Sequence, residues 1–406
     1  MTNNNNKYSP ELRFPEFQNS KKWEIEVIKN ICDICTGKSN TQDQVKDGEY
    51  PFFIRSKVPV KSKKYLFDCE AVITIGDGKI GQVYHYVTGK FDLHQRCYKM
   101  SNFRKVMGKY FYYYFSSHFY ERAMKMTAKA TVDSVRLEMI ADMPFLLPSF
   151  LEQKKIADCL SSLDIYLDTT KRKLELLKEY KKGLMQQLFP RNGKNVPELR
   201  LPEFQNAPVW VYQALGSIGD TYGGLSGKSA EDFGKGKPYV TYKQVFTSIE
   251  IDFSNCSLVQ IAQNEKQNKL QYGDILVTIS SETPEEIGYT ALVTTKKIPE
   301  CYLNSFCFIF RLFDKRKIDI NFMIYLLSSD VYRKNVVRIA QGITRFNISK
   351  TRYKEIELPI PSSKVEQRKI AKLLSSIDQQ LTHYEEKIRS LELHKKGLTQ
   401  RLFPKI

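Results

Sequence analysis

The stretch at residues 152–190, EQKKIADCLSSLDIYLDTTKRKLELLKEYKKGLMQQLFP, returns at residues 366–404 as EQRKIAKLLSSIDQQLTHYEEKIRSLELHKKGLTQRLFP. The offset is 214 residues without a gap, and 20 of the 39 positions are identical. A shorter echo lies upstream, with PELRFPEFQN at 10–19 and PELRLPEFQN at 197–206. Repetition of this kind indicates two copies of one structural unit, and it has to be recognised before any local motif is interpreted.

Both long copies carry an apolar stripe with alternating spacings of four and three residues, which is typical of a coiled coil. A helix of about 38 residues spans about 57 Å at 1.5 Å per residue. Neither stripe can be buried by its own helix in water, so we expect the two helices to pair with each other as a coiled coil. Matched Gly and Pro residues predict that both helices end near the Leu-Phe-Pro sequence. The predicted seam residues are Ile156, Leu160, Leu163, Leu167, Leu174 and Leu177 in the first copy, and Ile370, Leu374, Ile377, Leu381, Ile388 and Leu391 in the second.

The segments between the helices repeat in pattern more than in identity. AVITI at 71–75 and DILVTIS at 274–280 predict equivalent strands, and CYLNSFCFIFRL at 301–312 reads as one aromatic-rich strand. KYFYYYFSSHFYERAMKM at 109–126 predicts a helix whose aromatic face packs in the core, and INFMIYLLSSDVYRKNVV at 320–337 falls at the same place in the second copy. The expected fold class is α+β, with two similar mixed α/β globular domains joined by the two helices in a pseudo-twofold internal repeat.

The repeat predicts six segments along the chain. They are an N-terminal segment at 1–20, a first globular domain at 21–149, a central long helix at 150–190, a linker at 191–209, a second globular domain at 210–361 and a C-terminal long helix at 362–406.

The composition of the 406 residues favours an anionic partner, because the formal net charge is +18. Nucleic acid is the first such partner and a membrane surface the second. The sequence has no run of 18 or more apolar residues, so we expect no transmembrane helix. The N-terminus lacks the apolar core of a signal peptide. Eight cysteines at irregular spacing fit a reducing cytoplasm.

Several motifs fail when their full patterns are required. Gly76, Gly78 and Gly81 have the dinucleotide-binding spacing, but a strand-like segment follows them, so they predict a β-hairpin. The Gly-Lys-Ser sequences at 37–39 and 227–229 lack the first glycine of a phosphate-binding loop, and the Cys-x-x-Cys pair at 32–35 has no second pair of zinc ligands. An Asp77-x-Lys79 fragment of a nuclease site lacks its acidic partner, and no methyltransferase motif occurs. We therefore expect no catalytic residue and no metal site on this chain.

Two features of the globular segments suggest contact with DNA. The repeated Gly-Lys-Ser loops can present backbone N–H groups and an ammonium to a phosphate, although an ordinary surface turn explains them equally well. AQGITRFNIS at 340–349 and AKATVDSVR at 128–136 occupy equivalent places but carry different side chains that can bond to bases or phosphates, and a polar helix-entry loop is the alternative for each of them. The candidate DNA-binding residues are Lys38, Ser39, Arg55, Lys57, Lys79, Lys129, Thr131, Arg136, Lys228, Ser229, Tyr242, Lys243, Ser280, Ser281, Gln341, Thr344, Arg345 and Asn347.

The chain resembles the specificity subunit of a type I restriction–modification system over nearly its whole length. The near-identical helices, which open with Pro-Ser and Glu-Gln-Lys/Arg-Lys-Ile-Ala and close with Lys-Lys-Gly-Leu-x-Gln-x-Leu-Phe-Pro, carry this resemblance. So do FFIRS (52–56), ITIGDGKIG (73–81), MTAKATVDSVR (126–136), TYGGLSGKS (221–229) and YLNSFCF (302–308).

The resemblance implies a non-catalytic subunit whose two target-recognition domains each read one half of a bipartite, asymmetric site in double-stranded DNA. The helices would form an antiparallel coiled-coil spacer that sets the gap between the halves and docks two adenine-methylating modification subunits, with two restriction subunits added for cleavage. S-adenosylmethionine, ATP and Mg²⁺ would be bound by those partners and not by this chain. The expected location is the bacterial cytoplasm, without a membrane partner.

Three other interpretations stay open at this point. The chain would be a DNA-binding scaffold or regulator if it had no methyltransferase partner. It would be an enzyme if the pure chain had nuclease or nucleotide chemistry, and a basic coiled-coil adaptor if it failed to bind DNA.

Overall fold

A computed structural model describes residues 9–127 and 134–404. The chain forms two compact units, and each long helix contributes to both of them. Unit 1 comprises the chain up to Arg172 together with the segment from Tyr384 onward, and unit 2 comprises Lys173–His383. This division differs in kind from the six predicted segments, whose boundaries stay a prediction.

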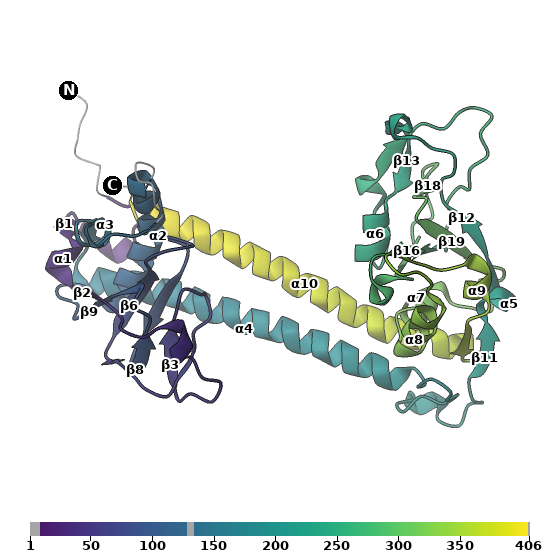
Figure 1. The fold of residues 1–406 in the computed structure, drawn as a ribbon, viewed down its shortest axis with the longest axis horizontal. Helices are drawn as coiled ribbons and strands as arrows, with labels where there is room; N and C mark the ends of the chain where they lie inside the picture. The colour runs from purple at the N-terminus through teal and green to yellow at the C-terminus, as the bar shows by residue number, and fades with distance from the viewer. Residues whose placement is uncertain (1–8, 128–133, 405–406) are drawn as a thin grey trace. The chain divides into compact units, whose positions relative to one another are not determined.

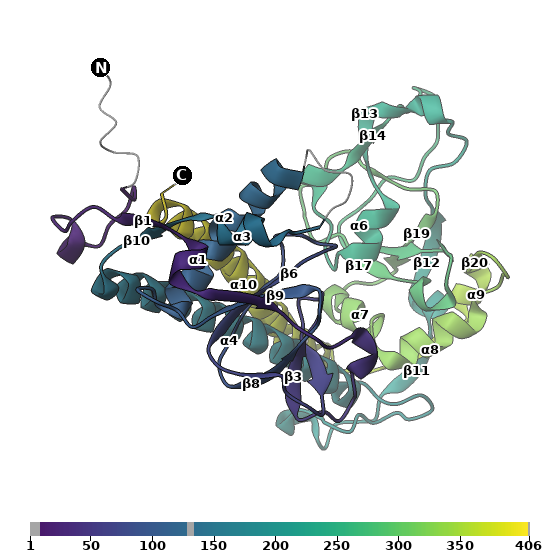
Figure 2. The ribbon, with the colours of Figure 1, turned by 60° about the vertical axis from the view of Figure 1, so that its left-hand side comes forward.

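Unit 1 contains two four-stranded sheets, a strand pair and a long aromatic helix (Figures 1 and 2). The sheets have the strand orders β2-β9-β6-β7 and β4-β3-β8-β5, and β1 pairs with β10. The elements are β1 (Glu24–Val27), α1 (Ile28–Ile31), β2 (Asp33–Thr36), β3 (Tyr50–Phe53), β4 (Val60–Ser62), β5 (Phe67–Asp68), β6 (Ala71–Ile75), β7 (Tyr84–Val87), β8 (Lys90–Leu93), β9 (Cys97–Ser101), α2 (Gly108–Thr127), α3 (Leu137–Ala141), β10 (Pro144–Leu147) and the first part of α4 (Phe150–Leu188).

Unit 2 repeats this plan with the orders β12-β19-β15-β17 and β14-β13-β18, and with the pair β11-β21. An additional small pair, β16-β20, is described below. The elements are β11 (Val211–Ala214), α5 (Leu215–Ile218), β12 (Gly219–Gly223), β13 (Phe233–Val240), α6 (Tyr242–Thr247), β14 (Ser257–Val259), β15 (Ile275–Thr278), β16 (Ser280–Ser281), β17 (Thr290–Leu292), β18 (Tyr302–Leu303), β19 (Cys307–Leu312), α7 (Ile320–Leu326), α8 (Asp330–Ile339), β20 (Phe346–Asn347), α9 (Lys350–Lys354), β21 (Glu357–Ile360) and the first part of α10 (Lys364–Leu402).

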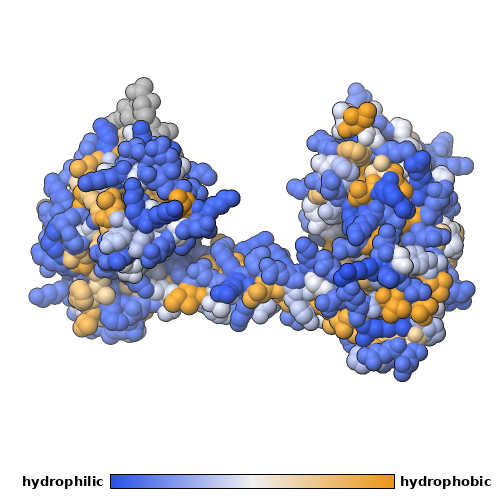
Figure 3. Space-filling view, turned by 60° about the horizontal axis from the view of Figure 1, so that its bottom comes forward, coloured by the Kyte–Doolittle hydropathy of each residue, from blue (hydrophilic) through white to orange (hydrophobic). Residues whose placement is uncertain are grey.

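The predicted fold class is confirmed: two repeats of mixed helix and sheet are present, together with the two long helices. AVITI and DILVTIS contain strands, as predicted, and the structure shows that these strands, β6 and β15, are completely buried. The glycine-rich turn is the predicted hairpin, since β6 pairs antiparallel with β7 and both Gly78 and Gly81 have positive φ. On the face seen in Figure 3, hydrophilic side chains dominate the surface of each unit, and apolar residues form small separate groups.

The aromatic face of α2 packs in the core, as the sequence predicted. Tyr110, Phe111, Tyr114, Phe115 and Phe119 are all fully buried. One detail was wrong: the segment at 301–312 is not one strand, because a turn separates β18 from β19. In unit 2 the segment at 320–337 forms two helices, α7 and α8, with a break at residues 327–329.

The Glu-Gln pair that opens each repeated helix ties the helix to its own unit. The buried carboxylate of Glu152 accepts two hydrogen bonds from the guanidinium of Arg13, both 2.7 Å, and one from the indole of Trp23, 3.3 Å. Glu366 accepts equivalent bonds from Arg200 and Trp210. This contact joins the short upstream repeat to the long one in each unit.

The neighbouring glutamines have an equally specific role. The Gln153 amide accepts from the backbone N–H of Met107 and donates to the carbonyls of Lys105 and Pro148. The Gln367 amide does the same with Asp319, Lys317 and Pro361. These bonds satisfy backbone groups at the start of α2 and α7. The presence of the same Glu-Gln pair in both repeats therefore has a structural cause.

Within each unit, parts of α4 and α10 run antiparallel beside each other. In unit 1, Lys395 pairs with Asp164, and Lys171 pairs with Glu392 at 2.7 Å, so positions rise along one helix as they fall along the other. In unit 2, Lys181 pairs with Asp378. In both units the aspartate also accepts a tyrosine hydroxyl, from Tyr113 at 2.7 Å and from Tyr325 at 2.8 Å.

Lys181 and Lys395 are polar residues at equivalent positions of the apolar stripe, and each is accommodated there because it pairs with an aspartate on the other helix. All twelve predicted seam residues are buried or half-buried. The structure therefore places the predicted stripe on the inner face of both helices.

The Leu-Phe-Pro end of each helix completes the core of a unit. In unit 1, Leu402 and Phe403 join the buried cluster, and the Phe403 ring lies 5.7 Å from Tyr110 and 5.5 Å from Tyr114. In unit 2, Phe189 lies 5.7 Å from Phe322. Leu402 and Phe403, at the end of α10, are therefore a structural part of the first globular unit.

Candidate nucleic-acid interface

Backbone contacts identify which loop positions of the two units correspond. The carbonyl of Phe53 accepts from the N–H of His94 in unit 1, and that of Val240 accepts from Asn304 in unit 2. In the loop after β6, the N–H of Gly76 donates to the carbonyl of Arg96, which precedes β9. In the loop after β15, the N–H of Ile279 donates to the carbonyl of Phe306, which precedes β19. Counting from these bonds, the pairs of equivalent positions are Arg55 and Tyr242, Asp77 and Ser280, Arg96 and Phe306, and Ser134 and Asn347.

In unit 1 these equivalent positions form a charged cluster. The carboxylate of Asp77 accepts from Arg55 at 3.0 Å and from Arg96 at 3.2 Å. The two guanidinium side chains are 48% and 62% exposed, so two cations share one acid at the surface. Ser134 forms an isolated bridge with Asp77, and Arg136 is exposed two residues further on. Exposed arginines held in this way are suited to phosphates or base edges.

In unit 2 three of the equivalent positions, Tyr242, Ser280 and Phe306, line a pocket of about 330 Å³ with different chemistry. Four of the predicted DNA-binding residues come together here, namely Tyr242, Ser280, Ser281 and Arg345, and Glu282, Glu286 and Phe306 complete the lining. The Arg345 guanidinium lies 5.6 Å from the centre of the Phe306 ring. One location thus carries a basic cluster in unit 1 and an aromatic, hydroxyl-lined hollow in unit 2.

A hairpin at 341–347 forms one wall of this region. Gln341 and Asn347 exchange backbone hydrogen bonds of 3.0 and 2.8 Å, and β20 pairs with β16 beside the pocket. Gly342 has a positive φ that permits the tight turn. Ile343, at the tip, is 94% exposed, and Thr344 beside it is exposed as well. The hairpin therefore presents its polar and apolar side chains outward.

The Gly-Lys-Ser sequences occupy different structural positions, contrary to the equivalence that the sequence suggested. Gly37 donates its N–H to Cys97, and the matching bond in unit 2 comes from Gly224, not from Gly227. The Ser39 hydroxyl is buried and donates to Asp92 at 2.7 Å.

The second Gly-Lys-Ser sequence is also engaged within its own unit. The Lys228 side chain is only 8% exposed and pairs with Glu265, while Ser229 caps a short helical turn by accepting from Asp232 N–H and bonding the Asp232 carboxylate. These side chains make internal contacts instead of presenting free groups to a phosphate, whereas Lys38 is exposed.

The remaining predicted residues are scattered around the two regions. Lys57, Lys79 and Lys243 are exposed. Gln341 faces Arg352, with a guanidinium N–H 2.7 Å from the amide oxygen once the amide is oriented to satisfy both ends. Lys129 and Thr131 lie outside the described residues.

Sequence reasoning missed Arg96, Phe306 and Glu282 as members of these regions. Arg96 and Phe306 each precede a cysteine at the same place in the repeat, in QRC and SFC. The signal was therefore present, because a change from cation to aromatic at one repeated position marks a site at which the two units differ.

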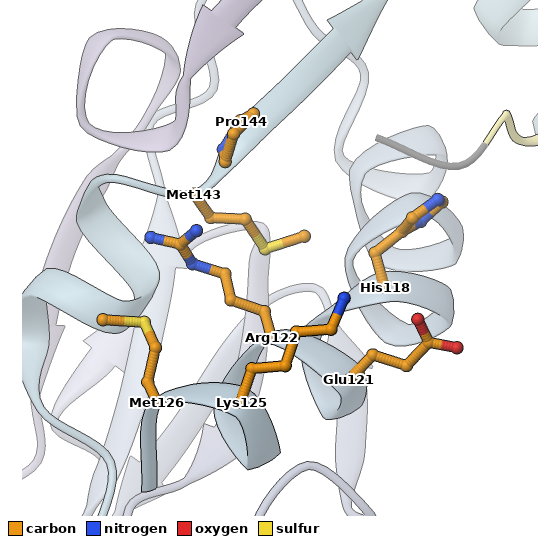
Figure 4. A pocket seen from close by; sticks show the side chains of 7 residues that line it. All are labelled: His118, Glu121, Arg122, Lys125, Met126, Met143 and Pro144. Carbon is orange, nitrogen blue, oxygen red and sulfur yellow. The ribbon is translucent and has the colours of Figure 1, made fainter. Parts of the chain in front are cut away.

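A separate pocket of about 210 Å³ lies on unit 1 between α2 and the start of β10 (Figure 4). His118, Glu121, Arg122 and Lys125 come from α2, and Met143 and Pro144 face them. Arg122 donates to the carbonyl of Met139 at 2.8 Å, and His118 bonds to the carbonyl of Pro404 at 3.0 Å. Because these polar groups support the helix and the chain end, the pocket shows no constellation for chemistry.

The described part of the chain has neither a cluster of metal-ligating side chains nor a helix suited to a membrane. Across 9–127 and 134–404, no three His, Cys, Asp or Glu side chains are grouped so as to hold a metal ion. In the same part of the chain, no helix has the length and hydropathy needed to cross a membrane.

Known proteins share both the sequence pattern and the fold. The family model described as type I restriction modification DNA specificity domain matches residues 20–179 and again 209–393. The MjaVIII type I restriction enzyme specificity subunit of Methanocaldococcus jannaschii is 26% identical over 385 residues, which cover 90% of this chain and 87% of that protein. The EcoDI specificity subunit of Escherichia coli is 28% identical over 182 residues, 44% of this chain and 40% of the relative.

The fold similarity extends over the whole chain. The S subunit of a type I restriction–modification system from M. genitalium superposes with a TM-score of 0.64 at 21% identity, covering 98% of this chain and all of that one. A chain from another type I system gives a TM-score of 0.53 at 15% identity, over 94% and 97% of the two chains. Since the family model matches twice and accounts for most of the sequence, the chain belongs to the type I restriction–modification DNA specificity family, as a specificity subunit that recognises DNA.

Proposed function

We propose that each unit reads one half of a bipartite, asymmetric site in double-stranded DNA. The observation that carries this proposal is the unequal chemistry at equivalent positions. Arg55, Asp77 and Arg96 in unit 1 stand where Tyr242, Ser280 and Phe306 stand in unit 2, on closely similar scaffolds. Two readers built on one scaffold with different polar groups would prefer different bases.

The surface charge supports a division between affinity and specificity. The net charge of +18 supplies attraction to phosphates, which is independent of sequence and weakens with salt. The divergent loops would then supply the base preference. We further propose that the chain has no catalytic step of its own and confers its specificity on partners in the cytoplasm.

The partners implied are two modification subunits that methylate adenine and two restriction subunits. S-adenosylmethionine, ATP and Mg²⁺ would serve those subunits. The repeated helices are the natural docking elements, because their sequences agree closely while the globular parts diverge, and identical partners require similar surfaces.

The helices would also set the number of unread base pairs between the half-sites. Two half-sites that are read from one face of DNA and are one helical turn apart are separated by about 34 Å. A 39-residue helix measures about 58 Å. A scaffold of this length can bridge such a gap. The family match favours a specificity subunit over a DNA-binding scaffold or regulator without methyltransferase partners.

Inserting one heptad into each long helix, after Arg172 in α4 and after His383 in α10, tests the spacer role. A heptad keeps the apolar seam in register, so the variant should fold and methylate a motif with unchanged half-sites and a different gap. Sequencing of the modified adenines, with the chain and its methylating partner acting on a random duplex library, measures this directly. A variant that methylates the original motif with its original gap rules out the spacer role.

A further inference from the structure

The pocket of unit 2 contains a buried polar group without a partner. Ser280 is 7% exposed, and its hydroxyl makes no hydrogen bond within the described part of the chain. A buried hydroxyl of this kind is costly unless a ligand or water satisfies it. Since Ser280 lines the pocket, its position indicates that something polar enters the hollow.

Opposite charges line the same pocket without neutralising each other. Glu282 and Arg345 are both exposed, and neither takes part in an ion pair among residues 9–127 and 134–404. The guanidinium instead lies over the Phe306 ring. In unit 1, by contrast, Asp77 is already paired with two arginines. Among the described residues of unit 2, the pocket therefore presents the Glu282 carboxylate and the Arg345 guanidinium without an ion pair between them, while the second carboxylate, Glu286, accepts from the Ser281 hydroxyl.

This combination matches one base pair better than the others. In the major groove, guanine presents two acceptors that an arginine fork can bond, and cytosine presents an amino donor that a glutamate can accept. Adenine is read best by Asn or Gln, and thymine offers a methyl group and one acceptor. A carboxylate and a guanidinium that face one hollow are therefore complementary to the two edges of a G·C pair.

We propose that this pocket reads a G·C base pair in the half-site of unit 2, with Arg345 donating to guanine O6 and N7 and Glu282 accepting from cytosine N4. This inference rests on the proposed function of unit 2 as the reader of one half-site. Ser280 lies in the floor and bonds to the polar edge or to a water that bridges to it. Phe306 holds the guanidinium plane by a cation–π contact.

The test uses the full chain with its methylating partner on a library of duplexes with randomised sequence, followed by sequencing of the methylated sites. Arg345→Ala and Glu282→Gln should each relax the same single G·C position in the half assigned to unit 2, and every other position should keep its preference. Discrimination at that position should fall about 5- to 150-fold, as expected for the loss of one good base contact.

Matched controls keep the result interpretable. Glu285→Gln removes a nearby exposed carboxylate outside the pocket, and Arg316→Ala removes an exposed guanidinium paired with Asp314 on the same unit. Both should leave the motif unchanged. Melting curves of each variant establish that the fold is retained, and Arg345→Lys separates charge from the bidentate fork, because lysine keeps the charge but not the planar geometry.

Three results would overturn the proposal. They are a unit 2 half-site without a specified G·C pair, a uniform loss of methylation across all sequences that Arg345→Lys restores, and an unchanged motif in both variants. Failure of the proposed function looks different, since the wild-type complex would then yield no bipartite motif at all.

Discussion

Replacing Glu366 by alanine is expected to destabilise unit 2 by about 3–5 kcal/mol, which is the typical cost of removing one partner from a buried ion pair. The side chains of Arg200 and Glu366 are 8% and 2% exposed. The bidentate contact with Glu366 raises the pKa of Arg200. Among the described residues Glu366 is the one carboxylate paired with this guanidinium, so the substitution would leave a buried cation without its acid. The indole N–H of Trp210 would lose its acceptor as well.

Urea unfolding and amide hydrogen exchange measure this effect. Exchange should accelerate in unit 2, for example in α7, while α2 of unit 1 keeps its protection. Lys154→Ala is the control, because its pair with Asp158 is exposed on both sides and should contribute at most about 1 kcal/mol. If Glu366→Ala were as stable as the control, the buried clamp would not stabilise the unit.

Truncation of Phe403 to alanine should destabilise unit 1 by about 3–5 kcal/mol, as large aromatic deletions in a core do. Phe403 is only 2% exposed and contacts Tyr110 and Tyr114 of α2. Although it lies at the far end of the sequence, its removal would leave a cavity under the first globular part. Faster amide exchange in α2, with α7 unaffected, is the expected observation.

Two comparisons sharpen the Phe403 prediction. Phe189→Ala should produce the mirror result, with α7 losing protection, because Phe189 packs on Phe322 in unit 2. Phe150→Ala removes an aromatic side chain that is 59% exposed and should have a small effect. Loss of protection in α7 after Phe403→Ala would contradict the assignment of the chain end to unit 1.

The long helices could be predicted from the sequence because a heptad stripe that runs along 39-residue helices admits few other folds. The recurrence of the same Glu-Gln pair in both helices is explained by contacts within each unit. Glu152 and Gln153 bond to groups that recur in the other unit, so both copies retain them. The aromatic helix α2 was predictable for the same reason, since its apolar face recurs with helical spacing.

The finer features depended on tertiary contacts that the sequence does not display. The turn between β18 and β19 is fixed by a bond from Asn304 N–H to the carbonyl of Val240, which is far away in the chain. Lys228 looked like a free cation because Glu265, its partner, lies 37 residues further on.

The candidate interface was partly predictable. Loops rich in polar residues after equivalent strands pointed to Tyr242, Ser280 and Arg345, which the fold brings to one pocket. Glu282 has no counterpart that would single it out, and Phe306 resembles a core aromatic in sequence. Both enter the site only because strand ends and the hairpin at 341–347 converge there.

The most direct test exchanges the recognition segment of unit 2, residues 210–361, for that of another specificity subunit of known motif, and leaves the helices and unit 1 unchanged. Sequencing of methylated adenines should then show one new half-site, with the other half and the gap retained. A motif that changes in both halves, or in neither, would contradict the claim that two unequal readers on one repeated scaffold each recognise half of the DNA site.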